Sequence, residues 1–380
     1  MAADQDNFYE TLAQRYMDET GVEIELLSLP VAAYETQLPT QLQGGNSADV
    51  FATVPGRGSP VSIVGLAEAE LLAPLDEASA SVVPAGTEAL YSVGGEIYGQ
   101  PISQVPVGII WNPAAAEAAG LTDYPTSFDE TLEACMLARE AEMNYMILAG
   151  AIPNNLGLMA QGLSATRVYA ENPNWNEQRA EGEVSFADSG WRTVLEDIEA
   201  MSEAGCFQEG AVGSGFEAID ANVGAGIAFS AALPGNAATS VGDARDTLIE
   251  VRAYAPRVAD DAPWVLLSAR DALAVSASAS DEAKAAAQDF LAWLAEPDNA
   301  AELAELEGSF PITGGLQDSV TDELQPVVDL VGSESFSTLP TDTWPNPAVY
   351  AELGSGIQGI LTGQLTVDDV LQAVDAAWDS

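Results

Sequence analysis

Histidine is absent from this 380-residue chain, and only 11 residues are basic, of which Lys284 alone is a lysine. Without imidazole, Ser-His-Asp and Cys-His nucleophilic machinery and histidine-bound zinc are excluded. The 59 aspartates and glutamates give a formal net charge of −48. Such a charge repels the phosphate backbone of nucleic acids and anionic membrane surfaces. We therefore expect no nucleic-acid partner.

Cysteine is nearly absent as well, with only Cys135 and Cys206 present. Two cysteines are too few for a cysteine-bound metal cluster, and they do not form a CxxC redox motif. One interpretation is a disulfide between them, and the other is two buried free thiols. No apolar run approaches the ~20 residues of a membrane span. The first residues show no signal peptide, although an exported protein would look the same if its leader preceded Met1.

Two explanations of the acidic, lysine-poor composition stay open. Adaptation to high salt would screen the repulsion among carboxylates, whereas a GC-rich genome would encode arginine in place of lysine. Neither explanation bears on the fold. A hydrophobic content of 47% and seven tryptophans argue against disorder, and the length favours two domains.

Strand-like and helix-like segments alternate along the chain, which predicts an α/β fold with largely parallel sheets. Ser280 is expected to cap one late helix, and Thr366 with Asp369 to form an approximate capping box at another. Predicted helices cover 4–20, 34–43, 127–142 and 190–204; predicted strands cover 22–27, 49–54, 105–111, 145–149, 226–230, 248–254 and 272–275.

A series of short segments follows a recognisable order and spacing over nearly the whole chain. The series resembles the extracellular solute-binding proteins of carbohydrate ABC importers, the family related to maltodextrin and oligosaccharide binders. That family begins with a strand before its first helix, and no such strand is visible here: either the chain is truncated at an internal Met, or the first sheet is one strand short. The segments are 20–22, 44–51, 71–76, 97–101, 108–112, 118–121, 204–207, 283–297, 308–312 and 361–366.

The resemblance implies a two-lobe, periplasmic-binding-protein-like (type II) fold with a ligand cleft between the lobes. Lobe one is expected to comprise 1–111 with 272–312, and lobe two 112–271 with 313–380. The chain would cross between lobes near 111–113, 266–272 and 311–315. Cleft residues are expected in loops at the carboxyl ends of strands.

Sugar rings present an apolar C–H face and a rim of hydroxyls, so a sugar site needs aromatic rings together with amide, carboxylate or arginine groups. Arg57, in a glycine-rich loop, is either a ligand for hydroxyls or part of a surface ion pair. Trp264 is either a stacking platform or a packing residue at a crossing. Trp111 is expected to be core. Further ligand candidates are Gln104, Asn112, Trp175, Phe229, Ser230, Asn236, Phe310, Trp344 and Asn346.

The resemblance implies a function in transport: a neutral mono- or oligosaccharide is bound outside the cytoplasm by closure of two lobes and delivered to the membrane permease of an ABC importer. Binding of a polyamine, a metal or another small solute by the same fold is one alternative. A glycoside hydrolase is a remote one, because two carboxylates suffice for that chemistry. We expect no enzyme activity, catalytic residue or cofactor, and an extracellular, cell-surface or periplasmic monomer.

Overall fold

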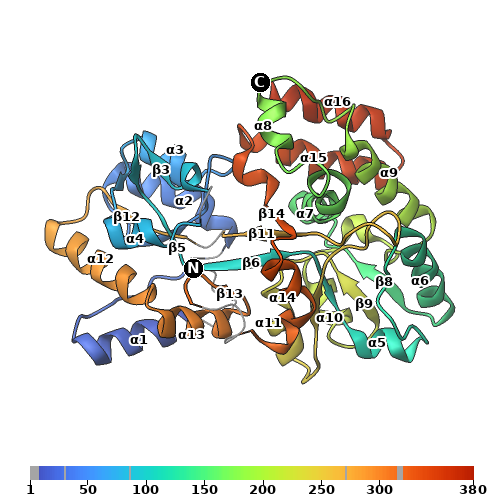
Figure 1. Cartoon of the computed structure of the whole chain (residues 1–380), viewed down its shortest axis with the longest axis horizontal. Helices are drawn as coiled ribbons and strands as arrows, with labels where there is room; N and C mark the ends of the chain where they lie inside the picture. Colours follow the sequence, from blue (N-terminus) through green and yellow to red (C-terminus); the bar gives the residue numbers. More distant parts are fainter. Residues whose placement is uncertain (1–7, 30, 85–86, 270–271, 315–319) are drawn as a thin grey trace. The chain divides into compact units, whose positions relative to one another are not determined.

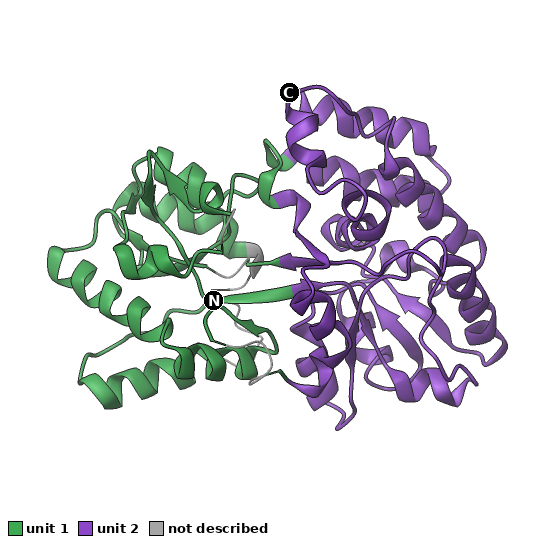
Figure 2. Ribbon diagram, in the orientation of Figure 1, with its two compact units in different colours: residues 1–105, 268–320, 342–347 green, residues 106–267, 321–341, 348–380 purple. Residues whose placement is uncertain are grey.

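The computed structural model describes residues 8–29, 31–84, 87–269, 272–314 and 320–380. The chain forms two compact units, drawn in green and purple in Figure 2. Unit 1 comprises residues 1–105, 268–320 and 342–347, and unit 2 comprises residues 106–267, 321–341 and 348–380. The predicted lobes differ from these units at every crossing except the one near 267. In particular, Trp344 and Asn346 belong to unit 1 rather than to lobe two.

Unit 1 is built around a sheet with the strand order β1-β12-β2, to which β5 is added alongside β12. The partners of β12 in this sheet are antiparallel to it, with Val50 opposite Val275 and Ala52 opposite Leu273. The elements of unit 1 (Figure 1) are α1 (Phe8–Thr20), α2 (Val31–Gly44), β1 (Val50–Thr53), α3 (Ile63–Glu68), β2 (Leu72–Ala73), α4 (Glu77–Ser81), η1 (Glu88–Leu90), β3 (Ser92–Val93), β4 (Glu96–Ile97), β5 (Gln100–Pro101), the start of β6 (Ser103–Val107), β12 (Ala272–Ser276), α12 (Asp281–Leu294), α13 (Pro297–Glu307) and β13 (Phe310–Pro311).

Side chains alternate between two core layers along the strands of this sheet. Phe51 and Ala274 pack with Leu38 and other residues of α2 and α3. Val50 and Leu273 belong to the other layer, together with residues of α1, α12 and α13. Because successive side chains of a strand point to opposite faces, the two layers cover opposite faces of the sheet.

The predicted strand over 22–27 is wrong: residues 21–29 have no regular secondary structure. The local alternation is present, and Val22 and Leu27 remain exposed. A strand is stabilised by hydrogen bonds to a neighbour and by packing against it. In the described residues, no strand pairs with this segment. Periodicity alone therefore does not make this segment a strand.

Unit 2 contains a sheet with the strand order β10-β7-β9-β8. Only β8 and β9 are parallel in it, while β7 is antiparallel to both of its neighbours. The elements of unit 2 are the end of β6, β7 (Ile109–Trp111), α5 (Pro113–Ala118), α6 (Phe128–Glu140), β8 (Asn144–Ile147), α7 (Pro153–Ser164), the π-helix η2 (Ala165–Tyr169), α8 (Trp175–Ala180), α9 (Gly190–Glu203), η3 (Ala211–Gly213), α10 (Glu217–Asn222), β9 (Ala228–Ala231), α11 (Ala237–Asp243), β10 (Glu250–Arg252), β11 (Val265–Ser268), η5 (Asp322–Leu324), α14 (Gln325–Gly332), β14 (Phe336–Thr338), α15 (Pro347–Leu361) and α16 (Val367–Trp378).

The prediction of largely parallel sheets is thus wrong: the described partners of β12 in unit 1 are antiparallel to it, and in unit 2 the parallel pairs β8–β9 and β11–β14 occur beside the antiparallel pairs β10–β7 and β7–β9. The predicted single strand over 105–111 is in fact two strands that meet at Gly108. A Cβ at this glycine would lie 2.2 Å from the carbonyl oxygen of Arg252. The close backbone approach at Gly108 leaves no space for a side chain.

The predicted helix caps are confirmed. Ser280 accepts a hydrogen bond from the amide of Ala283 at the start of α12. At α16, Thr366 and Asp369 each bond the other residue's backbone N–H, which completes the capping box with aspartate in place of glutamate. None of the helices in the described residues is long and apolar enough to cross a membrane.

Candidate functional site

Unit 1 brings two of the predicted candidate segments together. The loop that carries Arg57 follows β1, and its Gly56 has a φ of +68°. A Cβ at Gly56 would lie 1.7 Å from the carbonyl oxygen of Asp342, so the backbone of 342–347 meets the loop directly. Gly56 also donates a backbone hydrogen bond to Leu90. The Arg57 loop and the segment with Trp344 are therefore neighbours, although 284 residues (341 − 57) separate them in the sequence.

The guanidinium of Arg57 forms a two-pronged ion pair with the carboxylate of Glu68. About half of each side chain is exposed. The hydrogen bonds raise the pKa of Arg57 and hold the pKa of Glu68 below its usual range. The surface ion pair that the sequence left open is thus present. A sugar hydroxyl would have to replace or share this carboxylate partner.

Trp344 is fully buried, with 1% of its surface exposed, whereas Asn346 is half-buried. Stacking by Trp344 is not supported, because a buried ring has no free face for a ligand. The amide of Asn346 remains a candidate for contact with hydroxyls.

Tyr91 is a buried group at this place that sequence reasoning missed. Its hydroxyl donates a hydrogen bond of 3.1 Å to the carbonyl of Ala269. Burial and the carboxylate of Asp342 both raise the pKa of Tyr91, which keeps the phenol neutral at physiological pH. No local sequence pattern points to this position.

Gln104 and Phe310 lie opposite each other where β6 pairs with β13. Gln104 is half-buried and stays a candidate. Phe310 is completely buried, so its placement does not support the predicted contact with a ligand. Its ring contributes to the interior of the protein instead.

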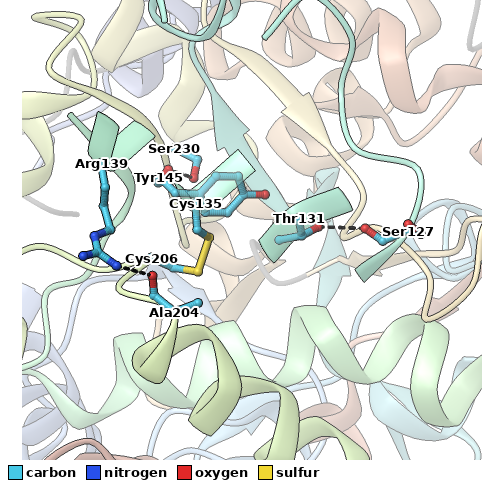
Figure 3. The surroundings of a disulfide bond; sticks show 8 residues. All are labelled: Ser127, Thr131, Cys135, Arg139, Tyr145, Ala204, Cys206 and Ser230. Carbon is cyan, nitrogen blue, oxygen red and sulfur yellow. Dashed lines mark hydrogen bonds between the residues drawn. A yellow bond between two sulfur atoms is a disulfide. The ribbon is translucent and has the colours of Figure 1, made fainter. Parts of the chain in front are cut away.

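In unit 2, the structure places Phe229 and Ser230 in the core. The ring of Phe229 is completely buried and lies edge-on to the rings of Trp111 and Tyr145. Ser230 donates a 2.6 Å hydrogen bond to the carbonyl of Tyr145 (Figure 3). Neither residue is accessible to a ligand, so both predictions are not supported. Trp111 is core, as expected.

Asn112 has a structural role that satisfies its amide. Its oxygen accepts a hydrogen bond from the amide of Ala115 and so caps α5, and its nitrogen donates to the carbonyl of Val223 at 2.7 Å. Only 2% of the residue is exposed. A ligand role for Asn112 is not supported, because its side chain is enclosed and already bonded on both sides.

Trp175 lies in a buried cluster of aromatic rings. Its ring packs edge-to-face against Phe186, Trp191 and Trp378 at centroid distances of 4.7, 6.1 and 6.2 Å. With 2% of its surface exposed, Trp175 offers no face to a sugar. The predicted ligand contact is therefore not supported.

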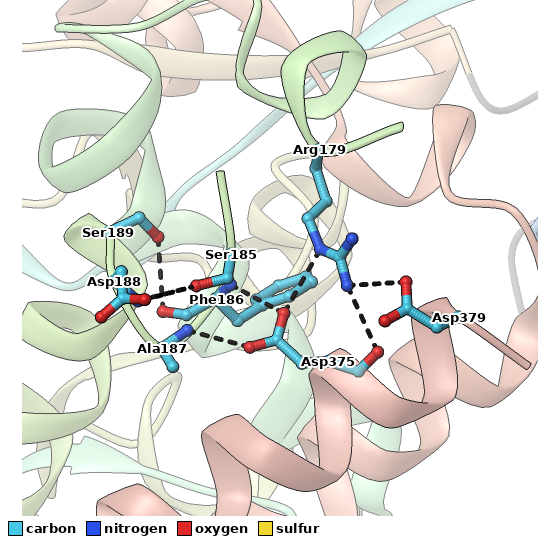
Figure 4. Close-up of polar contacts among 8 residues, drawn as sticks. All are labelled: Arg179, Ser185, Phe186, Ala187, Asp188, Ser189, Asp375 and Asp379. Atoms are coloured by element: carbon cyan, nitrogen blue, oxygen red, sulfur yellow. Dashed lines mark hydrogen bonds and ion pairs between the residues drawn. The ribbon is translucent and has the colours of Figure 1, made fainter. Parts of the chain in front are cut away.

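The same cluster fixes the C-terminal helix. Arg179 on α8 forms ion pairs with Asp375 on α16 and with Asp379 directly after it, and its guanidinium lies 5.4 Å from the ring centre of Trp378. The Asp375 carboxylate also accepts hydrogen bonds from the amides of Phe186 and the next residue (Figure 4). These contacts tie α16 to α8 and to the segment that follows it.

The disulfide between Cys135 on α6 and Cys206 after α9 is present (Figure 3). Arg139 lies on the same helix and donates to the carbonyl of Ala204 at 3.1 Å. The bond joins α6 to the segment directly after α9, and both cysteines are completely buried. Free cysteines are absent, which resolves the alternative left open by the sequence.

A second buried charge cluster lies in unit 2. Arg167, on the π-helix, pairs with Asp197, and both side chains are 1% exposed. Arg257 pairs with the other oxygen of Asp197. Burial raises the pKa of Asp197 while the two arginines oppose that shift, and burial lowers the pKa of Arg167. Arg167 and Asp197 are inside the unit, whereas about half of the Arg257 side chain is exposed.

Asn236 and Trp264 are the candidates of unit 2 that stay partly accessible. Asn236 precedes α11 without capping it, so its amide is not committed to the helix end. Trp264 directly precedes β11, and its indole nitrogen donates to the hydroxyl of Ser337 at 3.0 Å. This bond fixes the ring while part of its surface remains exposed.

Another polar group of unit 2 was missed by sequence reasoning. Gln161 accepts hydrogen bonds from the amide and hydroxyl of Thr341, and Asn176 donates to the carbonyl of Pro340. These bonds hold Pro340 and Thr341, the last two residues before the chain passes from unit 2 into unit 1. Gln161 lies within a helix of small and apolar residues, so no local pattern points to it.

Residues 2–301 match the family of bacterial extracellular solute-binding proteins, and the chain belongs to this family. Its members work outside the cytoplasm as binding proteins. No curated protein sequence matches the chain. In the described part of the chain, no group of three or more acidic or cysteine side chains is placed to hold a metal ion.

Solved structures of low sequence identity share the fold over almost the full length. A chitin oligosaccharide binding protein is 16% identical, with a TM-score of 0.83 over 100% of this chain and 96% of its own. A sugar transporter from Bacillus licheniformis in complex with stachyose is 17% identical, with a TM-score of 0.74 over 99% and 96%. A solute-binding protein from Thermotoga lettingae bound with α-D-tagatose is 16% identical, with a TM-score of 0.76 over 98% and 96%. The two-lobe type II fold expected from the sequence is confirmed.

Proposed function

We propose that this protein binds a neutral mono- or oligosaccharide outside the cytoplasm and delivers it to the permease of an ABC importer. The observation that carries the proposal is family membership over residues 2–301. Sugar complexes among the structural relatives support the ligand class. An uncharged ligand also suits a chain with a net charge of −48, since no anion has to approach a negative field.

The accessible candidates supply the chemistry that a sugar needs. Trp264 offers an aromatic surface for the C–H face of a ring, and Asn236 offers an amide for hydroxyls. In unit 1, the accessible polar side chains are those of Arg57, Gln104 and Asn346. We place ligand contacts on these five residues and leave the buried candidates out.

Delivery without chemistry requires a ligand that favours one arrangement of the units over another. Backbone links join the two units at five points along the chain, after residues 105, 267, 320, 341 and 347. A ligand shifts such an equilibrium only by its differential affinity for the two states. We propose that the sugar favours closure in this way, with its bonds left intact and with the protein acting as a monomer without a cofactor.

A thermal-shift screen tests the ligand class. The screen compares raffinose, stachyose, chitin and xylan oligomers and tagatose with spermidine and divalent metal ions. A ligand at a hundred times its dissociation constant stabilises the folded protein by about 2.7 kcal/mol. Stabilisation by at least one sugar and by no polyamine or metal supports the proposal. Stabilisation by spermidine or a metal alone would replace the sugar with that ligand.

Calorimetry of Trp264→Ala with the sugar found in the screen tests the stacking platform. We expect binding to weaken about tenfold or more, because the ring face is lost. Trp264→Phe should keep much of the affinity, and Val258→Ala, an exposed position just before Trp264, should leave it unchanged. Unchanged binding by Trp264→Ala would exclude the residue. Sustained release of reducing sugar by the pure protein would instead indicate a glycoside hydrolase.

A further inference from the structure

Trp264 differs from every other tryptophan of the chain in its exposure. The other six are each at most 8% exposed, whereas Trp264, which lies in the described residues like the rest, is half-buried. A ring left partly in water forgoes the favourable transfer of its apolar surface into the interior. The exposed part of this ring is therefore surface that the folded core does not use. The six buried residues are Trp111, Trp175, Trp191, Trp293, Trp344 and Trp378.

One hydrogen bond holds the ring of Trp264 in place. An indole has a single donor, its Nε1–H, and no acceptor. This donor is bonded to the hydroxyl of Ser337 at 3.0 Å. The bond therefore uses the whole hydrogen-bonding capacity of the side chain. To a ligand, Trp264 offers the apolar surface of its ring and no donor.

The backbones on either side of this bond belong to paired strands. Trp264 directly precedes β11, and Ser337 is the middle residue of β14. The two strands are parallel, with Leu266 opposite Ser337. The amide of Val265 also donates to the carbonyl of Ser335 at 3.2 Å. Because this ladder joins the two backbones directly, the hydroxyl of Ser337 has a fixed position relative to the ring.

A sugar gains affinity from a ring that is already in place. Stacking requires the face of the ring to lie against the C–H face of the sugar. Ordering a mobile side chain during binding lowers affinity by a factor of roughly two to twelve. We propose that Ser337 is a positioning residue of the sugar site, whose hydroxyl holds the indole of Trp264 by its edge and leaves the ring face free for a sugar ring. This inference rests on the proposed function.

The indole signal of Trp264 tests the proposal without any ligand. In a proton–nitrogen NMR spectrum, this signal is the one that disappears in Trp264→Phe. Ser337→Ala should shift the signal and speed its hydrogen exchange about fivefold, because the donor loses its partner. Ser337→Thr keeps a hydroxyl and should restore the parent behaviour. Ser335→Ala is the matched control, since the hydroxyl of Ser335 pairs with that of Ser333 at 3.1 Å and its loss should leave the indole signal unchanged.

Calorimetry with the sugar identified by the thermal-shift screen tests the role in binding. Ser337→Ala should weaken binding about fivefold, while Ser337→Thr and Ser335→Ala should bind like the parent. In the Trp264→Phe background, Ser337→Ala should have no further effect, because phenylalanine has no N–H for the hydroxyl to hold. A serine that merely supports β14 would weaken binding equally in both backgrounds.

Two results would overturn the proposal. They are an unchanged indole signal in Ser337→Ala, and an equal loss of sugar affinity with and without the Trp264→Phe substitution. Failure of the proposed function looks different, because no sugar would then stabilise the parent protein in the screen. The indole exchange is read without sugar, and in that case it still decides whether Ser337 holds the ring.

Discussion

Unit 2 holds its interior together with a disulfide, a buried ion pair and a cluster of aromatic rings, whereas in the described residues of unit 1 the strand β1 pairs with β12 alone and borders a cavity. The two units have the same kind of architecture, with helices packed on a mixed or antiparallel sheet. They differ in how completely the sheet and its core are filled. We therefore expect the contacts that contribute most to the free energy of unfolding to lie in unit 2.

Regions with unfilled space and unpaired backbone open at lower free energy than tightly packed ones. We therefore expect native-state hydrogen exchange to be fastest at β1 and residues 22–29, and slowest at β8 and β9. The comparison also separates the roles of the candidates, since the buried aromatic residues of unit 2 support the fold. Variants that remove single stabilising contacts measure how much each contact contributes to the free energy of unfolding.

Removal of the disulfide should have the largest effect. The double substitution Cys135→Ser with Cys206→Ser opens a loop with a sequence separation of 71 residues, which the chain-entropy relation equates with about 4 kcal/mol. Urea unfolding of the double variant measures the loss. Hydrogen exchange should accelerate in α6, β8 and α9 more than at β1, and a loss confined to unit 1 would contradict the comparison.

Neutralising the buried Asp197 should cause the next largest loss of stability. Asp197→Asn leaves Arg167 buried without its carboxylate partner, which we expect to cost about 3 kcal/mol or more. Denaturant unfolding checks the value. Glu196→Gln is the matched control, because Glu196 is exposed on the same helix and its loss should change the stability little. Equal losses of stability in the two variants would show that the buried ion pair makes no special contribution to the fold.

Loss of the cap of α16 should have a smaller effect. Thr366→Ala removes the side-chain acceptor for the amide of Asp369 and should destabilise the protein by about 1 kcal/mol. Thr366→Ser keeps the hydroxyl and should retain most of the stability. Thermal unfolding of the three proteins distinguishes a cap from a side chain that merely packs, in which case serine would be no better than alanine.

Removing the exposed Arg57–Glu68 ion pair of unit 1 should have the smallest effect on stability. Arg57→Ala removes the cause of the lowered Glu68 pKa, so the carboxyl should titrate nearer its ordinary value in an NMR titration. A carboxyl with a depressed folded pKa stabilises the protein above its unfolded pKa and loses this effect as the pH falls through the folded pKa. The difference between parent and variant should therefore vanish in acid.

Glu130 provides the internal control for that titration. The backbone and side chain of Thr126 lower its pKa, with no arginine involved. The Arg57→Ala substitution should leave the titration of Glu130 unchanged. A change in the pKa of both Glu68 and Glu130 would indicate a general change of the acidic surface rather than the loss of one ion pair.

Several parts of the fold could be predicted because they depend on neighbours in the sequence. The cap at Thr366 needs only a residue three positions on, and the apolar stripe of α16 needs only helical spacing. The binding-protein fold followed from the order of short segments along the chain. The strand over 22–27 failed for the opposite reason, since pairing depends on what lies beside it in space.

The candidate site was predicted less well, because accessibility is a tertiary property. Trp175 and Trp344 lie among asparagines and prolines and look like loop residues, yet other parts of the fold bury both. Asn112 and Ser230 are polar residues near strand ends, but their side chains bond to the backbone inside unit 2. Gln104, Asn236 and Trp264 retain accessible surface.

The sequence by itself determined which chemistry is excluded, because a chain without histidine and with one lysine lacks the required groups whatever its fold. It also determined the alternation of helices and strands and the helix caps, which rest on short-range periodicity and hydrogen bonds. Only the tertiary structure decided which aromatic rings are covered and which strands pair. These properties arise from contacts between residues far apart in the chain, and no local pattern encodes them.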